Sequence, residues 1–326
     1  MRFILMLESQ QGLSYGDHVA IARRAEANGF EALFRSDHYQ SFPGPTGRPT
    51  TDAWTIMAGL ARDTERIGLG VLVSPMTFRH PGSFAKVVTT VDEMSGGRIE
   101  VGVGAGWHEL EHRQLGLPFP PIKERADLME DTLAILQGLW GEPDGWTYDG
   151  HQVSIRDAQF HPKPVDVPGR PRTAVGGARP RVLVGGGGSP RSLRMAARYA
   201  DEFNLSSSGP DDARDVFAAV DAACEAIGRD PSTLAHSTMA GVLIGRDEAE
   251  MGERLSTLVG MVGSGEDGQE WLDERLGRWI TGTPEEAREQ VRQFEAAGVE
   301  RLMLQDLLPW DLDMVDLMGD ALVGQL

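Results

Sequence analysis

The sequence predicts an α/β protein with the architecture of a (β/α)8 TIM barrel that carries insertions. Apolar runs of strand length alternate with amphipathic stretches of helix length almost to the end of the chain, the pattern of β/α units around a parallel sheet. Eight such runs can be counted, and a closed barrel requires eight strands. A doubly wound open sheet is the alternative, because alternation alone does not show that a sheet closes.

The amino-terminal half of the chain supplies the first four strands. A helix over about residues 15–27 follows the first strand and stops at Asn28-Gly29. The helix after the third strand falls at about 83–94, and the helix after the fourth lies between Pro121 and Leu139. We expect these four strands at residues 3–7, 32–34, 67–73 and 99–103.

Two irregular stretches interrupt the second half. Residues 141–171 are rich in Pro and Gly and contain two short strand-like pieces, which predicts an inserted loop or hairpin. Residues 260–282, a glycine-rich stretch that includes Gly265, predict a second insertion. We expect one domain over residues 1–326, with its last four strands at 181–184, 202–205, 239–244 and 301–304.

Composition narrows the classes of partner. The 326 residues are 40% hydrophobic and 25% charged, which is ordinary for a globular protein. The 49 Asp and Glu exceed the 31 Lys and Arg, so the formal charge is −18. The negative electrostatic field of such a protein repels polyanions, which excludes nucleic acid as the main partner. We therefore expect a small-molecule substrate.

The compartment is predicted from cysteine usage and hydropathy. The single cysteine, Cys224, can form neither an intramolecular disulfide nor a thiolate cluster. The apolar run at residues 3–7 is too short for a signal peptide, and no stretch reaches the roughly 18 apolar residues of a membrane helix. We therefore expect a cytoplasmic protein without a membrane partner.

In a barrel the active site lies where the strands end, so the residues after each strand are the informative ones. These residues are polar, small or glycine, as a mouth that binds a large, flat, partly anionic ligand requires. They are Glu8, Ser36, Asp37, His38, Ser74, Pro75, Gly104, Ala105, Gly106, Trp107, Gly186, Gly187, Gly188, Ser189, Ser206, Ser207, Ser208, Gln305 and Asp306.

The strongest single motif is Gly185-Gly186-Gly187-Gly188-Ser189-Pro190, between a strand and a helix. Ser189 suits an N-cap and Pro190 a first helical position, so free amides and the positive helix end would face the loop and favour a phosphate. The alternative is a tight turn without a ligand. The motif is not a dinucleotide fingerprint, because Pro190 stands where the third glycine belongs.

Two further features have both a structural and a functional interpretation. Gly102, Gly104 and Gly106 lie on one face of the fourth strand, which either permits close backbone packing or leaves room for a ring system. His38 is the only histidine at a predicted strand end. It is either an acid or base toward a bound substrate or a hydrogen-bonded structural residue.

The segment His108-Glu109-Leu110-Glu111-His112 matches the pattern of zinc proteases, in which two imidazoles on one helix face bind zinc and the glutamate activates water. Here it directly follows Trp107, and the downstream Gly-x-x-His spacing is missing. We favour a solvated helix start. A zinc hydrolase, with His151 or His161 as third ligand, is a distant alternative, and a non-catalytic cofactor carrier is another.

These residues resemble the luciferase-like flavin and deazaflavin oxidoreductases, which are (β/α)8 barrels. The matching stretches run through almost the whole chain in the family's order. They are Ser36-Asp37-His38-Tyr39, residues 69–81, Ser95-Gly96-Gly97-Arg98, residues 101–107, residues 184–191 and Gly282-Thr283-Pro284-Glu285-Glu286. Within the family, Ser36-Asp37-His38 and the pattern at residues 104–111 are most similar to the branch that uses coenzyme F420.

The resemblance implies roles for individual residues. His38 would lie beside the ring as acid or base, a non-prolyl cis peptide would fall at Leu72-Val73, and the chain would form a homodimer. Sugar-phosphate-oxidising members carry a carboxylate where this chain has Trp107. The expected cofactor-binding residues are Asp37, His38, Leu72, Val73, Pro75, Gly104, Ala105, Gly106, Trp107, Gly186, Gly187, Gly188, Ser189 and Arg191.

Function is accordingly expected to be hydride transfer between F420 and a small organic substrate, with no metal. The alternative within the same fold is an FMN-dependent monooxygenase, in which reduced flavin reacts with oxygen. The deazaflavin lacks the nitrogen that supports the peroxide adduct, so the cofactor decides the reaction.

Overall fold

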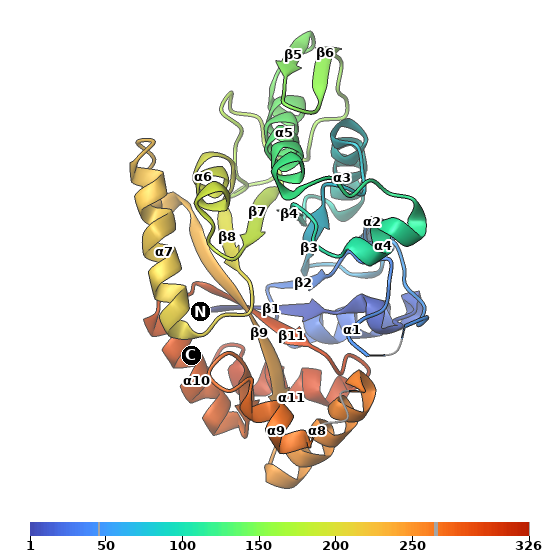
Figure 1. Cartoon of the computed structure of the whole chain (residues 1–326), viewed down its shortest axis with the longest axis vertical. Helices are drawn as coiled ribbons and strands as arrows, with labels where there is room; N and C mark the ends of the chain where they lie inside the picture. The colour runs from blue at the N-terminus through green and yellow to red at the C-terminus, as the bar shows by residue number, and fades with distance from the viewer. Residues whose placement is uncertain (45, 264–266, 326) are drawn as a thin grey trace.

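The computed structural model describes residues 1–44, 46–263 and 267–325. Eight parallel strands follow one another around a closed barrel, and the pairing of β8 with β9 completes the ring (Figure 1). This closure confirms the TIM barrel and rules out the open sheet. The barrel strands are β1 (Arg2–Leu7), β2 (Ala32–Arg35), β3 (Gly68–Pro75), β4 (Ile99–Gly104), β7 (Arg181–Gly186), β8 (Glu202–Leu205), β9 (Ala235–Ile244) and β11 (Arg301–Asp306).

Helices surround the barrel (Figure 1). Ser14 caps the first of them in a capping box with Asp17, at the expected start. The helix after β3 begins earlier than expected, because Pro81 takes its first position and His80 caps it. The surrounding helices are α1 (Tyr15–Ala27), α2 (Ala53–Asp63), α3 (Pro81–Ser95), α5 (Ile122–Gly141), α6 (Pro190–Tyr199), α7 (Pro210–Glu225), α8 (Glu248–Val262), α10 (Pro284–Ala296) and α11 (Leu312–Leu322).

The interior of the barrel is filled at its amino-terminal end. Arg301, at the start of β11, is 0% exposed, and its guanidinium reaches across the barrel interior to pair with Glu100 of β4 and Glu202 of β8. A compact apolar cluster lies inside the barrel, formed by Ile4, Met6, Ala32, Phe34, Leu72, Leu183 and Met303. Because this end is packed, a ligand has room only where the strands end.

The two irregular stretches, residues 141–171 and 260–282, contain short helices and strands of their own. Residues 141–171 include an antiparallel hairpin of β5 (Trp146–Asp149) and β6 (Ser154–Ala158), which lies away from the barrel mouth (Figure 1). Asp131 of α5 holds it by accepting hydrogen bonds from the Tyr148 hydroxyl and from the amides of residues 151–153.

The second stretch adds α9 (Gly268–Asp273) and β10 (Ile280–Gly282), which pairs with the outer part of β9 as a ninth strand of the sheet. A strand of three residues is too short to show a sequence period, and it was not predicted. Gly265, expected in this insertion, lies outside the described residues. In the described part of the chain, no helix combines the length and the apolar character needed to cross a membrane.

Candidate active site

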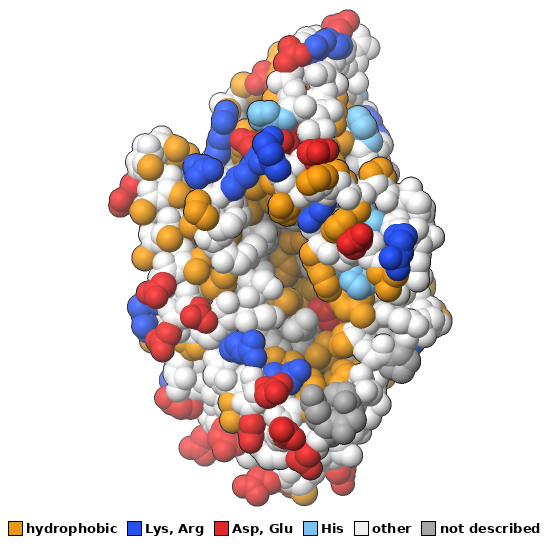
Figure 2. Space-filling view, in the orientation of Figure 1, with side chains coloured by type: hydrophobic (Ala, Val, Ile, Leu, Met, Phe, Trp, Pro, Cys, Tyr) orange, Lys and Arg blue, Asp and Glu red, His pale blue; other side chains and the backbone are white. Residues whose placement is uncertain are grey.

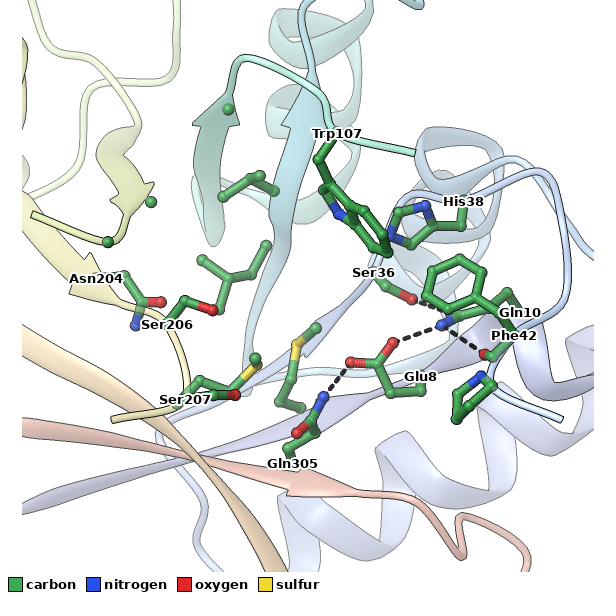
Figure 3. Close-up of a pocket in the computed structure, with 18 of the residues that line it drawn as sticks. Glu8, Gln10, Ser36, His38, Phe42, Trp107, Asn204, Ser206, Ser207 and Gln305 are labelled. Atoms are coloured by element: carbon green, nitrogen blue, oxygen red, sulfur yellow. Dashed lines mark hydrogen bonds between the residues drawn. The ribbon is translucent and has the colours of Figure 1, made fainter. Parts of the chain in front are cut away.

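A cavity of about 1010 Å³ opens at the carboxyl ends of the barrel strands. Figure 2 shows it as a hollow with apolar side chains inside, and Figure 3 shows the polar groups that enter it. Leu72 and Val73, which the resemblance implied, line it. Many residues expected from strand ends line it too: Glu8, Ser36, His38, Pro75, Gly104, Ala105, Gly106, Trp107, Gly186, Gly187, Ser206, Ser207 and Gln305.

Four expected cofactor-binding residues do not line the cavity: Asp37, Gly188, Ser189 and Arg191. The Asp37 carboxylate is buried in an ion pair with Arg79. Its complete burial raises the pKa of Asp37, and the Arg79 charge opposes that rise. The Arg191 guanidinium is turned to α5, 2.6 Å from Asp127 and 2.9 Å from Glu130. Both side chains are thus engaged within the protein.

His38 and Glu111 form a hydrogen-bonded pair at the cavity wall. The Nδ1 of His38 lies 3.0 Å from Oε1 of Glu111, and Oε2 of Glu111 accepts from the Tyr39 amide at 2.9 Å. The Glu111 side chain is only 1% exposed, so the carboxylate is fixed. In the described part of the chain Nε2 of His38 has no hydrogen-bond partner, and the ring lines the cavity. Nε2 of His38 is therefore available to form a hydrogen bond with a ligand in the cavity.

Glu111 was not among the predicted site residues. It belongs to α4 (Glu109–Leu115), a short helix that follows β4 and Trp107 in the chain. The hydrogen bond to His38 places Glu111 beside the segment that follows β2. The segment was interpreted as a possible zinc motif and as part of the pattern at residues 104–111 that resembles the F420-using branch, but neither interpretation gave Glu111 a role. The sequence feature that could have identified it is an acidic residue four positions after Trp107, on a helix that starts at the barrel mouth.

The two histidines of that segment have different partners. His108 precedes α4, and its Nε2 lies 3.0 Å from Oε1 of Gln40, while burial lowers its pKa. His112 Nε2 lies 2.6 Å from the Thr77 hydroxyl. Among residues 1–44, 46–263 and 267–325, no three His, Cys, Asp or Glu side chains gather as a metal ion would need. A zinc centre therefore has no support in this arrangement.

The wall of β3, β4 and β7 is built around Val73. The peptide Leu72-Val73 is cis, as the resemblance implies, and the β3–β4 register shifts between Val71 and Ser74. A Cβ added at Gly104 would lie 2.4 Å from Val73 Cγ2, and one at Gly185 would lie 2.8 Å from Cγ1. A Cβ at Gly102 would lie 2.4 Å from the Val71 carbonyl oxygen. Close packing against Val71 and Val73 thus explains Gly102 and Gly104 in β4.

The glycine loop ends β7 and starts α6 as predicted. Ser189 caps the helix by accepting from the Ser192 amide, and Pro190 is its first residue. Gly188 has φ of +82°, a conformation that favours glycine. Gly187 lines the cavity, and a Cβ there would meet nothing within 4 Å. Protein packing therefore does not require a glycine at this position.

The cavity floor is polar. Glu8, directly after β1, accepts hydrogen bonds from Gln10 Nε2 at 2.7 Å and from Gln305 Nε2 at 2.6 Å (Figure 3). The Ser36 hydroxyl donates to Gln10 Oε1 at 2.5 Å. Gln10, on the 3-10 turn Ser9–Gln11, was not predicted, because no strand-end pattern marks it.

The outer wall comes from the second insertion and the β4–α4 loop. Trp271, Arg275, Arg278 and Trp279 line it, and Trp107 stands at the mouth with 64% of its surface exposed. Arg275 lies over the ring of Trp271 at 3.7 Å. Two other tryptophans do not line the cavity: Trp54 is buried against Ser74, and Trp146 stacks on Tyr148 in the hairpin.

Comparisons with known proteins agree on one family. The model of the luciferase-like monooxygenase family matches residues 1–301. The F420-dependent glucose-6-phosphate dehydrogenase of Intrasporangium calvum is 28% identical over 318 residues, covering 86% of each chain. The enzyme of the same name from Beutenbergia cavernae is 34% identical over 193 residues, which is 59% of this chain and about half, 52%, of that relative.

A solved structure shows the same fold over nearly the whole chain. It is an F420-dependent secondary alcohol dehydrogenase in complex with an F420-acetone adduct, with a TM-score of 0.80 and 19% identity. The match covers 98% of this chain and 97% of that one. At this identity the match supports the barrel and does not identify the ligand.

Proposed function

The chain belongs to the luciferase-like monooxygenase family, and we propose that it is an oxidoreductase that uses coenzyme F420 to transfer a hydride to or from a small organic substrate. The relatives named as F420-dependent enzymes support this cofactor. The observation that carries the proposal is the cavity itself, in which His38, held by Glu111, faces a wall made by Val73 and the glycine loop.

The residues present fit such a cofactor. The cavity of about 1010 Å³ exceeds what a tricyclic ring needs, and Gly187 leaves its backbone uncovered beside the start of α6. Val73, Pro75 and the stretch 104–107 would contact the ring, and Gly186, Gly187 and the Ser189 cap would hold its phosphate. When bound, the deazaflavin supplies the carbon that accepts or donates the hydride.

The protein's own contribution is orientation and a proton. Glu111 accepts from Nδ1 of His38, which places the exchangeable site of the imidazole at Nε2. His38 then donates or accepts the substrate proton, while Trp107, Phe42 and the insertion wall limit the access of water.

The substrate need not be that of the named relatives. Trp107 stands where sugar-phosphate-oxidising members carry a carboxylate, and Glu109 is exposed and outside the cavity lining. We propose a substrate other than a sugar phosphate. The homodimer and the cytoplasmic location stay predictions.

An FMN-dependent monooxygenase is the second candidate, favoured by the description of the matched family. Titrating the cofactor-free protein with F420 and with FMN separates the two. We expect F420 to bind at least tenfold more tightly. A lower dissociation constant for FMN would overturn the proposal.

A further inference from the structure

Glu8 brings a carboxylate into the cavity. The residue is 8% exposed, and among the residues that the structure describes its side-chain oxygens accept hydrogen bonds from the carboxamides of Gln10 and Gln305 (Figure 3). Within the residues that the structure describes, no Lys, Arg or His nitrogen lies within 4.0 Å of it. The two glutamines fix the carboxylate in place.

This arrangement leaves hydrogen-bonding capacity unused. An ionised carboxylate offers about four acceptor positions, of which the glutamines fill two. A buried charge is costly unless it is paired or fully hydrogen-bonded. Since Glu8 lines the cavity, a ligand that brings an O–H or N–H donor to the floor would satisfy it.

The position of Glu8 indicates that it would contact the substrate rather than the cofactor. Around the barrel, β1 and β11 lie across from β4 and β7, because β2 and β3 separate them on one side and β8 and β9 on the other. If the proposed ring lies against β3, β4 and β7, the floor beside Glu8 and Gln305 remains for a second molecule. His38, at the end of β2, stands beside this space (Figure 3).

Charges in the cavity limit what that molecule can be. The Glu8 carboxylate repels an anionic group from the floor and favours a group that donates a hydrogen bond. We propose that Glu8 determines specificity by accepting a hydrogen bond from the hydroxyl group of a neutral organic substrate. This inference rests on the proposed function.

The test compares two probes of similar shape, cyclohexanol and its methyl ether, methoxycyclohexane, by saturation-transfer NMR titration of the F420-loaded protein. The wild-type protein should bind the alcohol at least fivefold more tightly than the ether. Glu8→Met should bring this ratio to about one, and Glu8→Gln should lower it. Glu274→Gln is the matched control, because Glu274 lines the outer part of the same cavity, and it should leave the ratio unchanged.

Several outcomes would overturn the role of Glu8. These are equal affinity for the two probes, binding of neither probe, a ratio that survives in both Glu8 variants, or an equal loss in Glu274→Gln. Circular dichroism melting checks that each variant folds, and Glu8→Gln alone carries the test if Glu8→Met does not. The F420 dissociation constant is measured first. Weak F420 binding by the wild-type protein rejects the proposed function, and the probe comparison on the cofactor-free protein then still tests Glu8.

Discussion

At the scale of single residues, His38 and Glu111 have complementary roles in the proposed proton transfer. The imidazole would move the proton, and the buried carboxylate holds its ring. Replacing His38 with Ala should leave the F420 dissociation constant within about twofold and lower kcat by roughly 10²- to 10⁴-fold, the range for loss of a general acid or base. Binding and turnover are measured on the same preparation. Unchanged turnover would remove His38 from the mechanism.

Glu111→Gln tests the supporting role. The amide keeps the shape of the side chain but has one acceptor oxygen, so it cannot accept from both His38 Nδ1 and the Tyr39 amide. We expect kcat to fall by about tenfold, less than the roughly 10²- to 10⁴-fold expected for loss of the acid or base itself. Glu109→Gln, on the exposed face of the same helix, is the control. If the two variants have the same kcat, Glu111 does not position His38.

Residue-scale prediction from the sequence worked where a local rule applied. Ser189 and Pro190 were identified as cap and first helical residue because capping depends on neighbours in the chain. Glu111 and Gln10 were missed because their roles arise from contacts with residues 73 and 26 positions away. Arg191 was expected among the cofactor-binding residues, and only the fold shows that α5 carboxylates engage it.

At the scale of elements, the wall of β3, β4 and β7 allows a matched pair of substitutions. Gly104→Ala puts a methyl group 2.4 Å from Val73 Cγ2, so it should destabilise the protein by about 1–3 kcal/mol, as overpacking does. Gly187→Ala meets no atom within 4 Å, so it should leave the melting temperature unchanged and weaken F420 binding about tenfold or more. Thermal melts and cofactor titrations give both quantities.

The opposite pattern would show that the glycine loop serves packing. If Gly187→Ala lowered the melting temperature and spared F420 binding, the loop would not hold the phosphate. The cause of the glycines in β4 could not be settled from sequence, because Val73, which fills the space, comes from a neighbouring strand.

Asp306, at the end of β11, links folding stability to pH. Burial raises its pKa from the ordinary 3.8 to about 7, and its Oδ2 has no hydrogen-bond partner in the described part of the chain. The folded state therefore binds this proton more tightly than the unfolded state. Its stabilising effect is full below about pH 4 and is lost as the pH rises to about 7.

Asp306→Asn removes this dependence while keeping an acceptor for the Leu308 amide. Relative to wild type, the variant should gain little at pH 4 and up to a few kcal/mol above pH 7, since one pKa unit corresponds to about 1.4 kcal/mol. Urea unfolding at both pH values measures the difference. A gain independent of pH would show that Asp306 does not titrate in this range.

At the scale of the whole molecule, the eight barrel strands were predictable because each is an apolar run between turn signals. Closure was not predictable from any one segment, since it depends on the pairing of the last barrel strand, β11, with the first, β1, after a full circuit of the chain. The placement of the second insertion over the cavity, with Trp271 and Arg275, is likewise a property of the assembled barrel.

A crystal structure of the F420 complex is the most direct test of the account. We expect the ring against Val73, the phosphate at the Gly186–Ser189 turn, and His38 Nε2 facing the space beside Glu8. A ring bound outside the cavity, or a phosphate held away from Gly187, would contradict it.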